Sequence, residues 1–402
     1  MLPSLTPDQL VKPRRFELRM SFLFAALFMP VGIHMPYFPL WLEDQGFGAR
    51  EIAMILSIPL FLRVVTAPLI TAFADRAGDR TMVLVACAAA TFVLSLGYFL
   101  PPSYGLLLAI SLALAVGWSP QAPLADSVAL SGVRRFGVDY SRMRIWGSVS
   151  FLFANLGGGL LLSATGTGAV PVIISAGLAG MLAAALLAPR LGPPRRPSPL
   201  SAAELQHAPS LLRPAFLLLV AGAGLVHSSH GFLYGFGAIY WKSLGIGEAA
   251  VGVLWAWGVV AEVCMFVVFR RVFGRVPPWV LLALAGLAAI LRWTATPLIW
   301  SWGLGLPGFF VVQSLHAVST GLILLGVQKM IAETVPDHRI GAAQGVAFFA
   351  AGFGMAAVTL AAGPLYDTLG ANGFHVMSGV AAAGIALVAF GALQPQRAGS
   401  GG

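Results

Sequence analysis

The chain has 402 residues, of which 58% are hydrophobic and only 10% are charged. With a mean hydropathy of +0.85, this composition excludes a soluble multidomain protein and a disordered one. Long apolar runs such as 82–100 and 376–393 exclude a transmembrane β-barrel, whose strands alternate apolar and polar residues. A membrane-spanning helix takes about 20 apolar residues, so we expect an all-α polytopic membrane protein with about twelve transmembrane helices.

The net charge of +9 would suggest nucleic-acid binding in a soluble protein, but the basic residues sort by side of the membrane. Most of the 24 Lys and Arg lie at the termini or in alternate short loops: Lys12, Arg14, Arg15, Arg19, Arg76, Arg80, Arg134, Arg135, Arg142, Arg190, Arg195, Arg196, Arg213, Arg270, Arg271, Arg275, Lys329, Arg339 and Arg397. Only Arg50 and Lys242 fall in the opposite loops. The positive-inside rule therefore predicts cytoplasmic N- and C-termini, contact with membrane lipids, and no nucleic-acid partner.

Apolar runs divided by Gly, Pro and charged residues predict twelve spans. They are 17–42, 49–73, 81–100, 104–130, 143–165, 169–189, 213–241, 247–269, 278–300, 305–330, 340–365 and 371–393. We expect two six-helix halves, 1–190 and 213–402, joined by a cytoplasmic central loop at 191–212. Prolines in the first two spans predict that these helices are weakened or interrupted; they are Pro30, Pro36, Pro39, Pro59 and Pro68.

The layout of six spans on each side of a central loop is that of the major facilitator superfamily. The segment Ala74–Arg80 resembles the loop signature of that superfamily, in which an acid and basic residues tie neighbouring helix ends at the cytoplasmic face. The segment differs from the usual pattern at Thr71, where a glycine is usual, and at Asp79, where a base is usual.

Longer stretches resemble the 3-phenylpropionic acid transporter family, whose relatives include lactose permease. These stretches are 37–42, 123–127, 139–148, 229–236, 239–241 and 313–316. The resemblance implies proton-coupled uptake across a bacterial inner membrane. Because relatives in this group carry aromatic acids, sugars or nucleosides, it does not fix the substrate.

Charged residues inside the spans mark candidate sites, because an ion in the bilayer needs a partner, a cavity or a role. In the first half, Asp126 and Arg144 lie at similar depths on consecutive antiparallel helices, so they could pair. The resemblance to lactose permease-like proteins implies that they form the core of the substrate site; the alternative is an ion pair that only joins two helices. Trp146 is expected to stack on a substrate ring, and Arg63 lacks an acidic neighbour in sequence and could anchor an anion.

In the second half, Glu262, Arg292 and His316 are predicted to couple proton movement to transport, because a desolvated carboxylate favours its protonated form and a nearby cation opposes this. A static charge pair is the alternative for Glu262. Lactose permease-like proteins carry another glutamate one turn past the histidine, but here that position is Ser319. His230 and Tyr234 share one helical face and are expected to bind substrate or to pack against neighbouring helices.

We therefore expect a monomeric secondary active transporter that takes up a small aromatic carboxylic acid by alternating access. It would use the proton gradient and no cofactor, and no metal, because Cys87 and Cys264 lack metal-ligand spacing. The alternatives are a sugar or nucleoside symporter, an efflux transporter, or a membrane-embedded enzyme or sensor. No G-x-S-x-G or H-E-x-x-H motif supports the enzyme, so we expect no catalytic residues.

Overall fold

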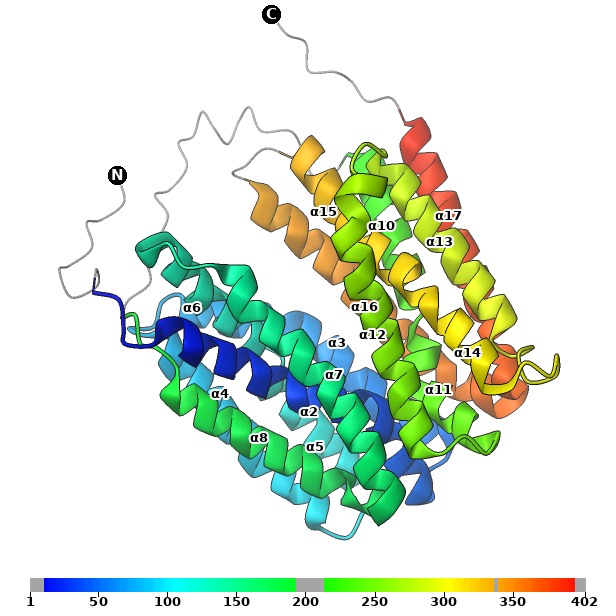
Figure 1. The fold of residues 1–402 in the computed structure, drawn as a ribbon, viewed down its shortest axis with the longest axis horizontal. Coiled ribbons are helices and arrows are strands. Elements are labelled where there is room, and N and C mark those ends of the chain that lie inside the picture. Colours follow the sequence, from blue (N-terminus) through cyan, green and yellow to red (C-terminus); the bar gives the residue numbers. More distant parts are fainter. Residues whose placement is uncertain (1–10, 193–212, 336–338, 395–402) are drawn as a thin grey trace, which may run out of the picture. The chain divides into compact units, whose positions relative to one another are not determined.

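The computed structural model describes residues 11–192, 213–335 and 339–394, and in this part of the chain all regular elements are helices. Most of the predicted central loop lies outside the described residues. The chain forms two compact units, Met1–Leu200 with Gly247–Val253, and Ser201–Ile246 with Leu254–Gly402. Within each unit, long helices run side by side (Figure 1).

The first unit is built from seven α-helices and two short 3₁₀ segments. They are α2 (Phe16–Asp44), α3 (Ala49–Ala74), α4 (Arg80–Ser95), η1 (Leu96–Phe99), α5 (Tyr104–Trp118), α6 (Gln121–Phe136), α7 (Tyr140–Thr165), η2 (Thr167–Ala169) and α8 (Val170–Leu187). The second unit contains α10 (Pro214–Ser228), α11 (Gly231–Ser243), most of α12 (Glu248–Val272), α13 (Pro278–Ala295), α14 (Gly305–Ser314), η3 (Ala317–Gly321), α15 (Leu322–Thr334), α16 (Ile340–Leu369), η5 (Gly370–Asn372) and α17 (Gly373–Leu393).

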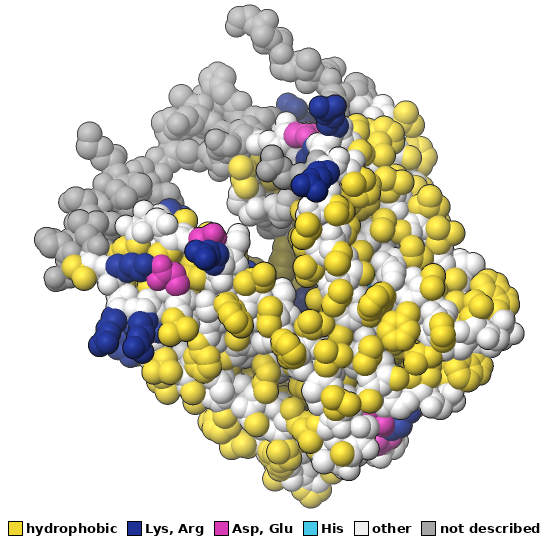
Figure 2. Space-filling view, in the orientation of Figure 1, with side chains coloured by type: hydrophobic (Ala, Val, Ile, Leu, Met, Phe, Trp, Pro, Cys, Tyr) yellow, Lys and Arg dark blue, Asp and Glu magenta, His cyan; other side chains and the backbone are white. Residues whose placement is uncertain are grey.

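Eleven helical segments of the described chain are long and apolar enough to cross a membrane. The last of them, Ile340–Leu393, contains both α16 and α17, which are separated by η5. The described residues therefore hold twelve spans, as the sequence predicts. Figure 2 shows apolar side chains over the sides of each unit, while most of the visible Lys and Arg side chains of each unit gather toward one of its ends.

The interrupted helices are not the ones that the prolines predicted. Helices α2 and α3 run without a break through their prolines, so neither of the first two spans is interrupted. The breaks fall in the fourth, seventh and tenth spans instead: between α5 and α6, between α10 and α11, and at η3, which is a π-helical turn. Breaks and π-helical turns of this kind are common beside functional sites in membrane transporters.

Close helix contacts in each unit depend on small residues and interhelical hydrogen bonds. In the first unit α2 packs against α6, α7 and α8, and the Tyr37 hydroxyl donates to the Asn155 carbonyl of α7 at 2.6 Å. In the second unit α10 packs against α16 and α17. There Gly222 and Gly384 face each other, and a Cβ atom on Gly384 would lie 2.8 Å from the Gly222 carbonyl oxygen. The two backbones are therefore too close to admit a side chain.

This contact predicts that Gly384→Leu destabilises the second unit. The new side chain would force α10 and α17 apart, at a cost of roughly 1–3 kcal/mol in the free energy of unfolding. Thermal unfolding of the purified protein in detergent, followed by circular dichroism, measures the effect. Gly379→Leu on the same helix is the control, because a Cβ at Gly379 meets no atom within 4 Å. Equal unfolding temperatures for the two variants would contradict the prediction.

Candidate functional site

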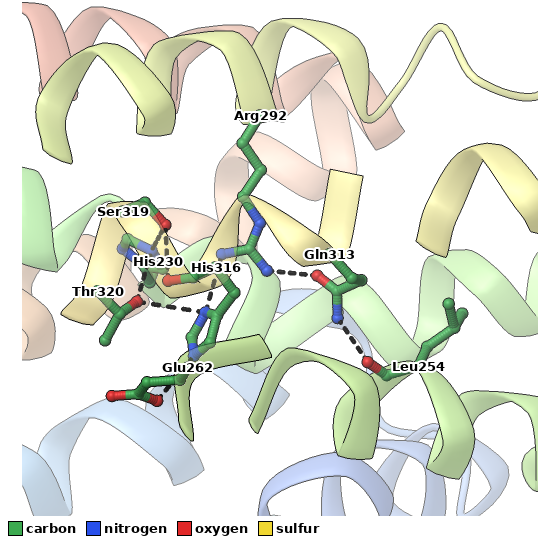
Figure 3. A network of polar contacts seen from close by, with 8 residues as sticks. All are labelled: His230, Leu254, Glu262, Arg292, Gln313, His316, Ser319 and Thr320. Carbon is green, nitrogen blue, oxygen red and sulfur yellow. Dashed lines mark hydrogen bonds and ion pairs between the residues drawn. The ribbon is translucent and has the colours of Figure 1, made fainter. Parts of the chain in front are cut away.

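A buried network of polar side chains crosses the second unit where its helices are interrupted (Figure 3). Glu262 comes from α12, Arg292 from the end of α13, and Gln313 from α14. His316 directly precedes the π-helical turn, and His230 lies at the break between α10 and α11. Side chains from four interrupted or neighbouring spans therefore meet in one place, as Figure 3 shows.

Arg292 determines which ring nitrogen of His316 carries the hydrogen atom. Its Nη1 lies 3.0 Å from His316 Nδ1, and a guanidinium can only donate hydrogen bonds. His316 Nδ1 must therefore accept, so a neutral His316 carries its hydrogen on Nε2. That Nε2 faces Glu262 Oε2 at 3.7 Å. The imidazole thus presents an N–H group to the Glu262 carboxylate.

Glu262 is consequently the group of this network that can gain a proton without disturbing it. A second hydrogen on His316 would sit on Nδ1, where it would face the Arg292 donor and its positive charge. A hydrogen on the Glu262 carboxylate meets no such obstacle. The Glu262 side chain keeps 20% of its surface exposed, so it is not fully enclosed by the second unit.

Gln313 ties this network to the backbone of α12. Its amide oxygen accepts a hydrogen bond from Arg292 Nη2, and its nitrogen donates to the Leu254 carbonyl at 3.1 Å. Leu254 and Glu262 are eight residues apart on α12, which is about 12 Å along a helix. The chain of contacts therefore begins and ends on the same helix.

His230 forms the second branch of the network and is fully buried. Its Nδ1 lies 3.0 Å from the His227 carbonyl and must donate to it. Its Nε2 is then an acceptor, and it lies 3.0 Å from the Ser319 hydroxyl and 3.2 Å from that of Thr320. Thr320 Oγ1 is also 3.2 Å from His316 Nδ1, and its single hydrogen can be donated to only one of the two imidazoles at a time.

An aromatic pair lies next to His230. The Tyr234 ring is 6.1 Å from the His230 ring and 5.7 Å from the Trp255 ring. Trp255 and Glu262 are seven residues apart on α12, so they lie on the same face of that helix. The sequence analysis missed Trp255, although this spacing could have revealed it.

In the first unit, the Asp126 carboxylate is bound by Tyr140 and not by Arg144. The Tyr140 hydroxyl donates to Asp126 Oδ1 at 2.8 Å, and the described residues contain no Asp126–Arg144 ion pair. The Arg144 guanidinium carbon instead lies over the Phe28 ring, 4.1 Å from its centre. Gly147 makes room for this stack, since a Cβ there would lie 2.8 Å from both Arg144 and Phe28. The guanidinium thus lies over a ring, close enough to Tyr140 and Asp126 to interact with both.

Trp146 is half exposed, at 50%, and the structure does not bring it together with Arg144. Two residues along a helix correspond to a rotation of about 200°, so the two side chains leave α7 on nearly opposite sides. The aromatic side chains that lie beside Arg144 are Phe28 and Phe24, which the sequence analysis did not identify.

Arg63 lies inside α3 and its Nε is buried without a hydrogen-bond partner. Val65, which is 57% exposed, points about 200° away around the helix. Arg63 therefore faces the interior of the first unit and not the lipid. The Arg63 guanidinium, whose Nε is buried without a partner, is a cation that an anion could stabilise.

No group of three His, Cys, Asp or Glu side chains in the described parts of the chain could hold a metal ion. The polar groups gathered in each unit are instead hydrogen-bond donors, acceptors and single charges. Such groups suit the binding of a small molecule and of a proton.

A family model described as "MFS_1 like family" matches residues 17–377, which is most of the chain. The chain belongs to the MFS_1 like family. Over 357 residues it is 29% identical to the "Probable 3-phenylpropionic acid transporter" of Escherichia coli (strain K12), with 88% of this chain and 92% of the relative covered. Over 296 residues it is 30% identical to the maltose permease of Geobacillus stearothermophilus, with 71% of each protein covered.

Solved structures of low sequence identity share the fold of this family member. The nucleoside transporter NupG superposes with a TM-score of 0.74 at 14% identity, covering 94% of this chain and 98% of the other. A bacterial homologue of the human lysosomal transporter Spinster, in an inward-facing and occupied conformation, gives a TM-score of 0.68 at 16% identity, covering 95% and 96%. These relatives are transporters and not enzymes. Together with the membrane-capable helices, they identify an integral inner-membrane transporter of a small molecule.

The loop signature of this major facilitator transporter ties two helix ends, as its resemblance implies. Asp75 Oδ1 at the end of α3 lies 2.6 Å from Arg80 Nη2 at the start of α4. Asp79, which stands where a base is usual, caps α4 by accepting from the Thr81 amide at 2.9 Å. At the corresponding place in the second unit, Lys329 of α15 donates to the carbonyls of Gly274 and Val276, both at 2.8 Å.

Proposed function

We propose that this protein is a secondary active transporter that carries a small aromatic carboxylic acid into the cell together with a proton, by alternating access. Glu262 carries the proton, His316 and Arg292 position it, and no cofactor is needed. Arg144 and Arg63 supply the positive charge that attracts the substrate anion, and the rings beside Arg144 offer it an apolar surface.

The contact between Glu262 and His316 supports proton coupling. His316 keeps its N–H directed at the carboxylate because Arg292 occupies its other nitrogen. An ionised Glu262 gains from this N–H and from the positive charge of Arg292 behind it, whereas a protonated Glu262 needs neither. A shift of Arg292 relative to Glu262 would therefore change the affinity for the proton, which is what a coupled transporter requires.

The charge balance of the first unit supports an anionic substrate. Arg63 and Arg144 have no acidic partner within 4 Å among the described residues, while Asp126 is the acceptor of a tyrosine hydroxyl. The name of the Escherichia coli relative, a phenylpropionic acid transporter, agrees with this substrate class. The maltose permease relative makes a sugar the second candidate, and a neutral sugar would not need the excess positive charge.

The proposed coupling predicts that Glu262→Gln abolishes substrate accumulation driven by a pH gradient. Exchange of substrate across the membrane should persist, because exchange does not require release of the proton and an amide mimics the protonated carboxylate. Uptake and exchange of radiolabelled substrate in proteoliposomes measure both activities. Glu333→Gln, at an exposed position near Lys329, serves as the control. Accumulation that survives with an unchanged pH dependence would assign Glu262 a structural role.

The proposed substrate class predicts that an aromatic carboxylate binds about tenfold tighter than its amide, since hydrogen bonds between ions are stronger than neutral ones. Arg144→Lys should lose much of this preference, because an ammonium lacks the planar fork that binds a carboxylate bidentately. Calorimetry with 3-phenylpropionate and 3-phenylpropionamide tests both statements. Arg142→Lys, an exposed neighbour on α7, should behave like the wild type. Equal affinities of acid and amide for the wild type would leave the sugar transporter as the better hypothesis.

The distribution of basic residues predicts the orientation, with both termini and residues 191–212 in the cytoplasm. In intact cells, cysteines introduced in 191–212 should be protected from a membrane-impermeant thiol reagent. Cysteines introduced at Gly46 or Gly245 should react with it. The same variants in inverted vesicles provide the control, because the labelling pattern should reverse. Labelling of 191–212 from outside the cell would refute this orientation.

A further inference from the structure

The Asp126 carboxylate uses only part of its capacity to accept hydrogen bonds. Its Oδ1 accepts from the Tyr140 hydroxyl at 2.8 Å, while Oδ2 makes no hydrogen bond within the described residues. Asp126 is only partly buried, and Oδ2 is not enclosed. An acid inside a membrane span needs a partner, a cavity or a role. Its second oxygen is therefore open to a proton or to a ligand.

The charge of Arg144 acts on Asp126 from a distance. Tyr140 and Arg144 are four residues apart, so they lie on one face of α7. The Phe24 ring contacts both of them, with its centre 6.1 Å from the Tyr140 ring and 5.5 Å from the Arg144 guanidinium carbon. Asp126 and Arg144 both lie in the described chain and form no ion pair, yet Arg144 is close enough for its charge to stabilise an ionised Asp126.

Few other charges surround this carboxylate. Helix α6 packs against α2, α3, α4 and α7. In the described chain, the titratable or charged groups that act on Asp126 are Tyr140 and Arg144, both from α7. Arg80 of α4 contacts α6 about 7.5 Å further along that helix, Arg63 is a cation inside α3, and α2 meets the site with aromatic rings. The carboxylate that an anion meets beside Arg144 is therefore that of Asp126.

A substrate carboxylate bound to Arg144 changes the charge balance at Asp126. It engages the cation that stabilises the ionised Asp126, and it brings a second negative charge close to it. Two carboxylates that share a site do not both stay ionised without cost, so one of them favours a proton. The substrate carboxylate is paired with Arg144, whereas Asp126 Oδ2 is open. A proton on Oδ2 can be donated to the substrate carboxylate while Tyr140 still donates to Oδ1.

We infer that Asp126 is a second proton-binding group, which takes one proton from water on Oδ2 when the substrate carboxylate binds to Arg144. The negative charge of the substrate and the positive charge of the proton enter together, so the net charge of the first unit does not change on binding. This inference rests on the proposed function. It adds to that function a link between substrate and proton that lies within the first unit and does not depend on Glu262.

A count of the protons that accompany binding tests this link. Calorimetry of the purified full-length protein, in buffers of different ionisation enthalpy, gives the number of protons taken up for each ligand bound. Glu262→Gln is used first, because it removes the proton site of the second unit. We expect 3-phenylpropionate to bind this variant with uptake of up to about one proton, and its affinity to fall by up to about tenfold per pH unit as the pH rises. At about pH 6 and above the ligand itself stays ionised.

The uncharged 3-phenylpropionamide should bind without this proton, because it brings no negative charge to Asp126. In the wild type, the acid should likewise take up more protons than the amide. The comparison of acid and amide therefore tests the link without any change at Asp126.

Variants of Asp126 assign the proton to its carboxyl group. In the Glu262→Gln background, Asp126→Asn should bind the acid without proton uptake, and Asp126→Glu, which keeps a carboxyl group, should retain it. Glu17→Gln, at an exposed position of α2, is the control and should also retain it. Acid binding without proton uptake in Glu262→Gln, equal uptake with acid and amide, or uptake that survives Asp126→Asn would overturn the inference and leave the proposed function intact. Failure of the wild type to bind the acid would overturn the proposed function, and the inference with it.

Discussion

The Arg292 guanidinium can donate hydrogen bonds but cannot accept one, and this restriction orders the polar interior of the second unit. Arg292 is buried to 1% exposure inside an apolar span, where each of its N–H groups needs an acceptor. Gln313 supplies one and His316 supplies another, while the Nε–H group has none. Because His316 must accept from Arg292, its remaining hydrogen faces Glu262. A single buried cation thus determines which group of the network can bind a proton.

The two units use their buried arginines differently. Arg292 donates to the neutral acceptors His316 and Gln313, and both Arg144 and Arg292 lie over an aromatic ring. The Nε atoms of Arg63 and Arg292 are both buried without a hydrogen-bond partner. In the proposed function, Arg292 positions the proton-binding groups of the second unit, and Arg144 and Arg63 attract the substrate anion.

The sequence predicted the spans well because apolar runs and helix length are local properties. The sequence also predicted that Glu262, Arg292 and His316 form one group, because helical rise gives the depth of a side chain in the membrane. Depth does not give direction, so the same reasoning could not show that Tyr140 would bind Asp126 or that Arg144 would turn to Phe28. The helix breaks at His230 and η3 contain no proline, so the local sequence gave no sign of them. Thr320 was missed because a threonine fits an apolar helix, although Gln313, His316 and Thr320 recur at helical spacing.

The π-helical turn after His316 holds one more residue than an α-helical turn would. If it relaxed into regular α-helix, α15 would rotate by about 100° relative to α14. The same rotation would move Lys329, which lies about 20 Å further along the helix. The Lys329 ammonium group donates hydrogen bonds to the carbonyls of Gly274 and Val276, just beyond the end of α12. Glu262 lies on α12 as well. Relaxation of the π-helical turn beside His316 would therefore disturb the contact that Lys329 makes just beyond the end of the helix that carries Glu262.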